Sequence, residues 1–297
     1  EGARDYLVPA RNHPGKFYAL PQAPQQFKQI LMASGFDRYF QIAPCFRDED
    51  ARADRSPGEF YQLDMEMAFA SQEDVFSIVE QVLPPVFEKY GIYKEASKAP
   101  FVRIPYLEAM DKYGSDKPDL RIDLVLTDAT EVMQGCGFAP FEGQTVKAIV
   151  VDDFTATRKQ IDAICAEVEV QTARKGFWFR VDENGEFVGG ISKFLQDRKE
   201  EVIKALGLKN GDFVGLAAGK KLEAQKTAGV YRKLLGAASE KHMKKDCYEF
   251  CWIVDFPMYE IGEESGELEF CHNPFSMPQG GMDALNNQDH LEILAYQ

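Results

Sequence analysis

The residues best suited to chemistry lie in one short charged segment. Seven of the nine residues from Arg47 to Arg55 are charged, and the two signs are interleaved. Apolar, β-prone segments precede and follow them, which predicts two strands joined by a charged loop. Guanidinium groups bind phosphates and carboxylates through paired hydrogen bonds. The segment therefore predicts a site for a ligand that carries phosphates and also contacts carboxylates, as in nucleotide chemistry.

Arg47 is the first candidate in this segment. If the strand before it alternates, one of its faces carries Gln41, Ala43, Cys45 and Arg47. The strand after the loop alternates too, with Leu63, Met65, Met67 and Phe69 on one side and Gln62, Asp64 and Glu66 on the other. If the two polar faces coincide, Arg47 is a clamp for a carboxylate or a phosphate. The alternative is that Arg47 pairs with Asp64 or Glu66 for structure alone, and the pattern does not decide between them.

Four further residues each have a functional interpretation and a purely structural or solvent-exposed one. Asp48 and Glu49 would repel ATP phosphates if unpaired, so they orient arginines, accept hydrogen bonds from a base or ribose, or are simply solvated. Phe60, at the mouth of the predicted hairpin, could stack on a planar base or belong to the core. His272 lies in a loop rich in Pro and Gly, where it is a functional residue or a surface residue.

The element that precedes the charged segment is a predicted helix over residues 24–34. Pro24 suits its first turn and Gly35 its end. On a helical wheel the predicted buried stripe consists of Phe27, Ile30 and Leu31. Gln25 and Lys28 lie together on a different face, three residues apart. The helix is therefore expected to bury its apolar stripe and to present these two polar side chains separately.

The composition narrows the class of protein. With 297 residues the chain has room for roughly two domains. A net charge of −14 argues against a protein that coats nucleic acid, although a local basic groove is still compatible with it. No apolar run has the length of a membrane span. The six cysteines are expected to be reduced, and Cys247 and Cys251 with His272 lack a fourth ligand, so no metal site is predicted.

The pattern of apolar and polar residues in the sequence changes near Asp116. From there helical and strand patterns alternate, with a strand near 146–151, a helix starting near Thr157 and a hairpin whose turn is Asn184-Gly185. A strand pattern like that of the first part returns near Tyr248. We therefore expect an α+β protein with three segments: 1–115 and 248–297 as two parts of one domain, and 116–247 as an insert.

Several motifs together resemble the bacterial-type aspartyl-tRNA synthetases, a family of class II synthetases. EGARDYLVPARNHPGKFYALPQAPQQFKQ is similar to the family's amino-acid pocket segment, and FRDEDARADR followed by FYQLDMEMAF to its second class II motif. YGSDKPDLR is similar to the entry of the insert found in bacterial members. WIVDFPMYE and CHNPFSMPQGG are similar to the return to the catalytic core. The resemblance runs from Glu1 to Gln297.

The resemblance implies an antiparallel-sheet catalytic domain interrupted by a GAD-like α+β insert. It implies that aspartate attacks the α-phosphate of ATP, a substrate, and that the aspartyl group then passes to tRNA. Arg47 is the catalytic residue by this resemblance. The implied aspartate site consists of Glu1, Gln25, Lys28, Arg47, Asp64 and His272, and the implied ATP site of Arg47, Asp48, Glu49 and Phe60. Lys28, facing the substrate's side-chain carboxylate, would reject asparagine because a cation would lose its anion.

The resemblance also implies partners. The anticodon-binding barrel and the dimer-forming first motif are expected before Glu1. The third motif and the Mg²⁺ ligands are expected after Gln297. We therefore expect a fragment, inactive when isolated, of a cytoplasmic homodimeric enzyme that charges tRNA(Asp). The residues leave open whether tRNA(Asn) is charged as well.

Three other interpretations compete with this one. An asparaginyl- or lysyl-type synthetase is disfavoured by the insert and by the context of Lys28. A tRNA-binding or amidotransferase-associated relative without ligase activity is expected to lack the Arg47 loop. An acidic structural protein is supported by composition alone.

Overall fold

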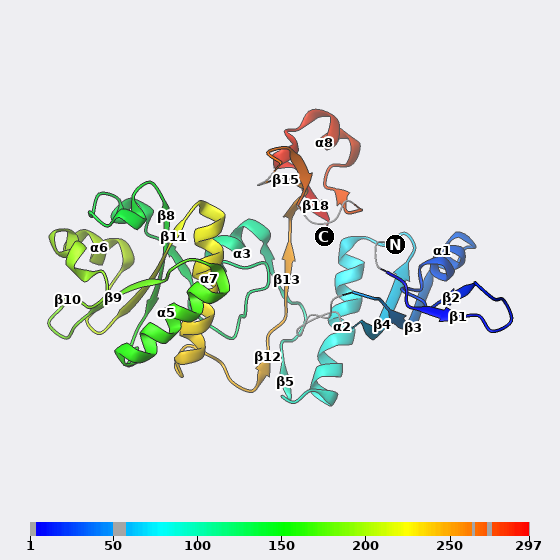
Figure 1. The fold of residues 1–297 in the computed structure, drawn as a ribbon, viewed down its shortest axis with the longest axis horizontal. Helices are drawn as coiled ribbons and strands as arrows, with labels where there is room; N and C mark the ends of the chain where they lie inside the picture. Colours follow the sequence, from blue (N-terminus) through cyan, green and yellow to red (C-terminus); the bar gives the residue numbers. More distant parts are fainter. Residues whose placement is uncertain (1–3, 50–57, 263–264, 272–274, 297) are drawn as a thin grey trace. The chain divides into compact units, whose positions relative to one another are not determined.

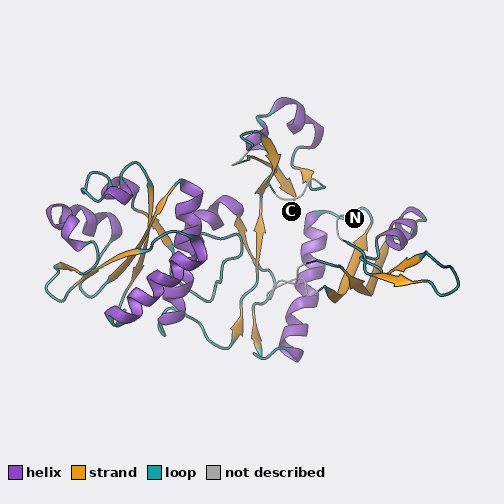
Figure 2. Ribbon diagram, in the orientation of Figure 1, coloured by secondary structure: helices purple, strands orange, loops and turns teal. Residues whose placement is uncertain are grey.

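The computed structural model describes residues 4–49, 58–262, 265–271 and 275–296 (Figure 1). The chain divides into two compact units, Glu1–Ile78 and Val79–Gln297, and the division falls within helix α2 (Gln72–Tyr90). Helices and strands occur in both units, and Figure 2 shows their distribution along the chain. Each unit is described separately below.

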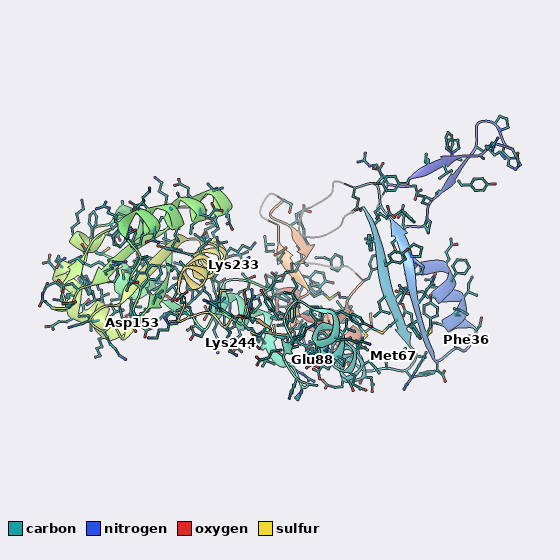
Figure 3. All side chains as sticks on the ribbon, turned by 90° about the horizontal axis from the view of Figure 1, so that it is seen from below. Phe36, Met67, Glu88, Asp153, Lys233 and Lys244 are labelled. Atoms are coloured by element: carbon teal, nitrogen blue, oxygen red, sulfur yellow. The ribbon has the colours of Figure 1, made fainter. Side chains whose placement is uncertain are left out.

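The first unit is built around one long antiparallel hairpin. Its elements are β1 (Leu7–Pro9), β2 (Phe17–Ala19), α1 (Gln25–Ala33), β3 (Arg38–Phe46) and β4 (Glu59–Met67). β3 and β4 pair along their whole length, and β1 pairs with β2. The predicted helix and the two predicted strands are confirmed. The alternation ends at Met67, because Phe69 lies in a turn with a φ of 55° and is fully exposed (Figure 3 marks Met67).

Helix α1 does not bury the stripe that its sequence predicts. Phe27 is 72% exposed and Ile30 is 64% exposed, whereas Lys28 and Leu31 are only partly exposed. The prediction is therefore wrong for Phe27 and Ile30. The reason is electrostatic: Lys28 forms ion pairs with two carboxylates of β4, so the helix turns its polar side toward the hairpin.

A five-stranded sheet with order β10-β9-β11-β8-β7 is formed by the central part of the second unit's sequence. Its strands are β7 (Leu126–Asp128), β8 (Thr145–Val151), β9 (Phe177–Val181), β10 (Phe187–Val188) and β11 (Phe213–Gly219), and its helices are α4 (Thr130–Met133), α5 (Arg158–Thr172), α6 (Lys199–Leu206) and α7 (Lys221–Ala238). The strand pairings are antiparallel. One apolar core lies under α4 and α6, and a second lies under α5 and α7, so both faces of the sheet are covered.

Local signals explain how two of these elements begin and turn. Thr157 and Gln160 form a reciprocal capping box at the start of α5, which satisfies backbone N–H groups that lack a helical partner. Gly185 has a φ of +80° in the turn between β9 and β10, a backbone conformation that glycine adopts without strain. The predicted helix start, the predicted strand near 146–151 and the predicted hairpin are confirmed.

Two short parallel pairs accompany this sheet in the second unit. The elements are β5 (Glu95–Ala96), β6 (Val102–Pro105), α3 (Tyr106–Tyr113), β12 (Cys247–Tyr248) and β13 (Cys251–Val254). β12 pairs with β5, and β13 pairs with β6. Helix α3 crosses α7 very closely, because a Cβ on Gly229 would lie 2.4 Å from the carbonyl oxygen of Gly114. Segments far apart in sequence are thus packed together: α3 against α7, and β5 and β6 beside β12 and β13.

The remaining described elements are short. They are β14 (Phe256–Pro257), β15 (Tyr259–Ile261), β16 (Leu268–Phe270), β17 (Met277–Pro278), α8 (Gly281–Asn287) and β18 (Leu294–Tyr296), with 3-10 turns at Ala139–Phe141, Ser192–Phe194, Gln196–Arg198 and His290–Glu292. β18 lies between β14 and β17. Within the described ranges, every helix is too short or too polar to span a bilayer.

Candidate functional site

The β3–β4 register brings the polar side chains onto one face of the hairpin. Gln41 lies opposite Asp64, Ala43 opposite Gln62 and Cys45 opposite Phe60. Residues directly opposite each other in an antiparallel pair project to the same side. The expectation that the two polar faces coincide is therefore confirmed. This shared face is called the polar face of the hairpin below.

Lys28 of α1 reaches the polar face and binds two carboxylates there. Its Nζ lies 3.0 Å from Oδ1 of Asp64 and 2.7 Å from Oε1 of Glu66. Burial disfavours the charge on Lys28, but its hydrogen bonds to Glu66 and Asp64 outweigh this effect and raise its pKa. The amine is thus firmly cationic at neutral pH, and it has one N–H group beyond the two that these carboxylates take.

Asp64 is the most deeply buried charged group on the polar face. Its side chain is 5% exposed, and its Oδ1 accepts hydrogen bonds from Lys28 and from Gln62 at 3.2 Å. Its Oδ2 is buried and has no hydrogen-bond partner among the described residues. A buried carboxylate oxygen without a donor is costly. The site therefore offers one strong acceptor to a ligand that carries N–H groups.

Arg47 lies just beyond β3, where backbone contacts hold it in place. Its N–H donates to the carbonyl oxygen of Gly58 at 2.7 Å, and its Nε donates to that of Gln22 at 3.4 Å. Its guanidinium lies over the ring of Phe60, 5.2 Å from the centroid. The alternative that Arg47 pairs with Asp64 or Glu66 is wrong, because Lys28 takes both carboxylates. Among the described residues, none pairs with the terminal nitrogens of Arg47.

The other predicted site residues are placed unevenly. Gln25 is partly exposed, one turn before Lys28 on α1. Asp48 and Glu49 are exposed at the end of β3, and their backbone N–H groups bond to the carbonyl oxygens of Arg4 and Arg47. The two remaining predicted residues of the aspartate site, Glu1 and His272, lie outside the described residues.

Glu66 is a site residue that the sequence interpretation did not single out. It was placed on the polar face by alternation and considered only as an alternative partner of Arg47, not as a partner of Lys28. In the structure it makes the shorter of the two contacts to Lys28. Its position two residues after Asp64 was the available signal, because period two puts both carboxylates beside the same cation.

No metal centre can be assembled from the described residues. Within them, no three His, Cys, Asp or Glu side chains converge in a geometry that would hold an ion. The six cysteines are free, and burial raises the pKa of Cys251 and of Cys247, which keeps these thiols protonated. We assign no described residue to Mg²⁺.

The comparisons with known proteins agree on one family. Residues 1–295 match the family model described as tRNA synthetases class II (D, K and N). The chain is 55% identical over 299 residues to an aspartate–tRNA ligase of Streptomyces coelicolor, and 52% identical over 308 residues to an aspartate–tRNA(Asp/Asn) ligase of Rickettsia felis. Each match covers 100% of this chain and 51% of the relative, so the chain spans about half the length of these relatives. It therefore belongs to the class II tRNA synthetases as a homologue of the aspartate–tRNA ligases, with the α+β fold and antiparallel sheet of their catalytic domain.

Proposed function

We propose that the protein activates L-aspartate with ATP and transfers the aspartyl group to tRNA. The observation that carries the proposal is the polar face of the hairpin, with the cation of Lys28, a buried carboxylate of Asp64 that has one unpaired oxygen, and, just beyond β3, the Arg47 guanidinium, whose terminal nitrogens have no partner in the described ranges. Aspartate has two carboxylates and one ammonium group, which need two cationic partners and one anionic partner. Lys28, Arg47 and Asp64 supply these three partners.

The proposed binding mode follows from the hydrogen-bond donors and acceptors of these groups that have no partner among the described residues. The third N–H of Lys28 donates to the side-chain carboxylate of aspartate. The unpaired Oδ2 of Asp64 accepts from the substrate's ammonium group. Arg47 donates to the α-carboxylate with its terminal nitrogens. Gln25, one helical turn from Lys28, and Glu1 and His272 complete the proposed aspartate site.

The first chemical step forms the mixed anhydride. An oxygen of the aspartate α-carboxylate attacks the α-phosphorus of ATP, and the bond from that phosphorus to the β-phosphate oxygen breaks, releasing pyrophosphate. Negative charge grows on the α-phosphate oxygens, and a fixed guanidinium stabilises it. Arg47 is held by Gln22, Gly58 and Phe60, so it needs little reorganisation to do this.

Phe60 is proposed to hold the adenine base. It is partly exposed on the polar face, and one side of its ring already contacts the guanidinium of Arg47. An aromatic ring that a cation covers on one side can stack a planar base on the other. Asp48 and Glu49, exposed at the adjoining strand end, are proposed to accept hydrogen bonds from the nucleotide rather than to contact its phosphates.

Discrimination against asparagine is proposed to depend on Lys28. An amide in place of the substrate carboxylate would leave the third N–H of Lys28 without an anionic acceptor. Glu66 and Asp64 make this stricter, because they fix the amine and leave it only one free donor direction.

The proposed partners extend beyond the described site. We propose that the acceptor is tRNA(Asp), that tRNA(Asn) is a candidate second acceptor, and that the protein acts as a cytoplasmic homodimer. A relative from Rickettsia felis carries both tRNAs in its name. Mg²⁺ is proposed to be required with ATP, with ligands outside the described residues.

The direct test is amino-acid-dependent exchange of pyrophosphate into ATP by the full-length protein. Aspartate is expected to support exchange, whereas asparagine and lysine are expected not to. Exchange supported by either of the other two, in preference to aspartate, would contradict the proposal. Aminoacylation of purified tRNA(Asp) and tRNA(Asn) then decides the range of acceptors.

A further inference from the structure

The residues just before β1 are anchored at two points. The backbone N–H of Asp48, just beyond β3, donates to the carbonyl oxygen of Arg4 at 3.0 Å. The backbone N–H of Leu20 donates to the carbonyl oxygen of Tyr6 at 2.9 Å. Asp5 lies between these two anchors, so its main chain is held on both sides by segments that are distant from it in sequence. It is not one of the aspartate- or ATP-binding residues proposed above.

The side chain of Asp5 reaches the segment that holds the guanidinium of Arg47. Its Oδ1 accepts a hydrogen bond from Nε2 of Gln22. The carbonyl oxygen of the preceding residue, Pro21, accepts from the backbone N–H of Phe46 at 2.8 Å. The carbonyl oxygen of Gln22 itself accepts from Nε of Arg47 at 3.4 Å. The contacts therefore run from a carboxylate through the side chain and main chain of one glutamine to the guanidinium.

The bond from Arg47 to Gln22 sets the direction of the guanidinium. The backbone of Arg47 is fixed by Gly58, and the plane of its guanidinium is fixed by the ring of Phe60. Neither contact prevents rotation of the guanidinium within its plane, whereas a bond at Nε does. N–H···O bonds are usually about 2.7–3.2 Å long, so a bond of 3.4 Å is lost after a small shift of the acceptor. The direction of the terminal nitrogens therefore depends on where Gln22 is held.

We propose that Asp5 is a positioning residue for the reaction and that it acts on Arg47 through Gln22. The inference rests on the proposed function, in which the guanidinium stabilises charge on the α-phosphate of ATP. By holding the side chain of Gln22, Asp5 keeps the carbonyl oxygen of the same residue within reach of Nε of Arg47. The terminal nitrogens are then directed before the substrates bind, and donors that are already in place stabilise developing charge best.

The exposure of this contact separates positioning from a role in stability. Asp5 is exposed and Gln22 is partly exposed, so water can replace the hydrogen bond between them when one partner is removed. Substitution at such a surface position changes the free energy of unfolding very little. Misplacement of a group that contacts the reacting atoms, by contrast, lowers the rate even when the shift is small. Loss of Asp5 is therefore expected to affect catalysis and not folding.

The test is a double-mutant cycle in aspartate-dependent pyrophosphate exchange by the full-length protein. Asp5→Ala is expected to lower kcat about fivefold, the loss that one hydrogen bond supplies, and to change KM for ATP by less than about twofold. In the Arg47→Ala background the same change is expected to have no further effect, because the group that Asp5 positions is gone. A residue that acted only on the fold would lower kcat by the same factor in both backgrounds.

Two further variants complete the design. Asp5→Asn keeps an oxygen that can accept from Gln22, so its kcat is expected to lie within about twofold of the wild type. Asp37→Ala is the matched control: this exposed carboxylate precedes β3 at its other end, and its side chain forms no hydrogen bond or ion pair with any described residue. It is expected to leave exchange unchanged. Hydrogen-exchange protection of β3 and β4 is expected to be equal in all these proteins.

Three results in the cycle would overturn the inference. They are an unchanged kcat in Asp5→Ala, the same loss in the presence and absence of Arg47, and equal losses in Asp5→Ala and Asp5→Asn. A loss in Asp5→Ala that disappears in the Arg47→Ala background and is rescued by Asp5→Asn supports it.

The proposed function can fail separately from this inference. A wild-type protein without aspartate-dependent exchange would overturn the proposed function. The placement of Arg47 would still be measurable, because exchange of its Nε–H with water, followed by ¹⁵N NMR, needs no substrate. Asp5→Ala is expected to accelerate this hydrogen exchange about fivefold relative to Asp37→Ala, since the bond to Gln22 opens more often. Equal exchange of the Nε–H in the two variants would overturn the inference, whatever the enzyme activity.

Discussion

Replacing Lys28 by Met is expected to destabilise the first unit by about 3 kcal/mol. The change keeps the length and the apolar stem of the side chain but removes the cation that Asp64 and Glu66 share. Of its hydrogen bonds to described residues, Asp64 would keep that from Gln62, at 3.2 Å. The cost arises because a buried carboxylate loses its counterion, and not because packing volume is lost.

The magnitude follows from the burial of the three groups. Removing one partner of a buried ion pair costs about 3–5 kcal/mol. The side chain of Lys28 is 17% exposed and that of Asp64 is 5% exposed, so water only partly compensates and the low end applies. Glu66, at 35% exposure, can turn toward solvent and adds little.

The assay must report on the first unit alone. Both tryptophans, Trp178 and Trp252, lie in the second unit, so tryptophan fluorescence would not follow the change. Hydrogen exchange of the amides in α1 and β4 does follow it. If exchange occurs through opening of this unit, a loss of about 3 kcal/mol lowers protection about 100-fold.

Two further variants make the result interpretable. Gln29→Met, an exposed neighbour on α1, is expected to change protection very little. Lys28→Met combined with Asp64→Leu is expected to recover most of the loss, because no buried charge then remains and the Gln62 amide, which loses its acceptor, is partly exposed to water. Equal protection in Lys28→Met and Gln29→Met would refute the reasoning.

Three other changes test the second unit. Gly229→Ala is expected to lower the free energy of unfolding by about 2 kcal/mol, because its Cβ would lie 2.4 Å from the carbonyl oxygen of Gly114. In a helix with open space at this position, Gly→Ala would instead raise the free energy of unfolding by about 1 kcal/mol. Such a rise, measured by urea unfolding, would contradict the close crossing. The hydrogen bond from Arg121 lowers the pKa of Asp119. The ionised Asp119 therefore stabilises the folded protein above about pH 4, and this stabilisation is lost as the pH falls through the lowered pKa. In Asp119→Asn the free energy of unfolding is expected to fall less steeply as the pH is lowered. The same slope as in the wild type would refute this. Burial, with Glu260, raises the pKa of Cys271 to about 11, so its alkylation rate should keep rising to that pH; a plateau near the ordinary value of about 8.5 would count against it.

Period two in the sequence was sufficient to predict the hairpin and its polar face. β3 lies where the strand before the charged segment was predicted, and Asp64 and Glu66 lie on the predicted side. This succeeds because alternation is a local property of an extended chain. The strand's end at Met67 was missed, because the turn that places Phe69 in the left-handed region is not visible in the alternation.

The orientation of α1 could not be predicted from its own residues. Hydrophobicity alone favours burial of Phe27 and Ile30, and the opposite occurs. The deciding contact joins Lys28 to Asp64, 36 residues away in the sequence. Ion pairs of this kind depend on the tertiary arrangement, so a helical wheel cannot include them.

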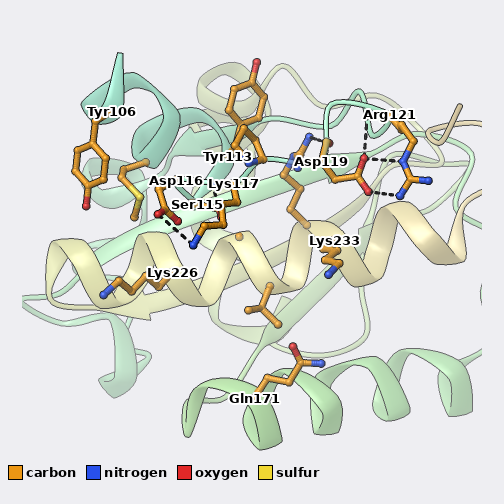
Figure 4. A pocket seen from close by; sticks show the side chains of 16 residues that line it. Tyr106, Tyr113, Ser115, Asp116, Lys117, Asp119, Arg121, Gln171, Lys226 and Lys233 are labelled. Carbon is orange, nitrogen blue, oxygen red and sulfur yellow. Dashed lines mark hydrogen bonds and ion pairs between the residues drawn. The ribbon is translucent and has the colours of Figure 1, made fainter. Parts of the chain in front are cut away.

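A cavity of about 630 Å³ beside α7, which Figure 4 shows, was missed for the same reason. Lys117 and Lys226 belong to segments more than a hundred residues apart, and each resembles an ordinary surface lysine in its own segment. The close crossing at Gly114 and Gly229 brings the two segments together. Only the sign of the local charge, opposite to that of the chain, could have drawn attention to them.

The central claim is that Arg47 stabilises charge on the reacting phosphate, and aspartate-dependent pyrophosphate exchange by the full-length Arg47→Ala variant tests it most directly. The account predicts a fall in kcat of about 100- to 1000-fold, with unchanged hydrogen-exchange protection of β3 and β4. Arg47→Lys is expected to recover little of the rate, because an ammonium cannot form the paired hydrogen bonds of a guanidinium. Wild-type exchange by Arg47→Ala would contradict the account.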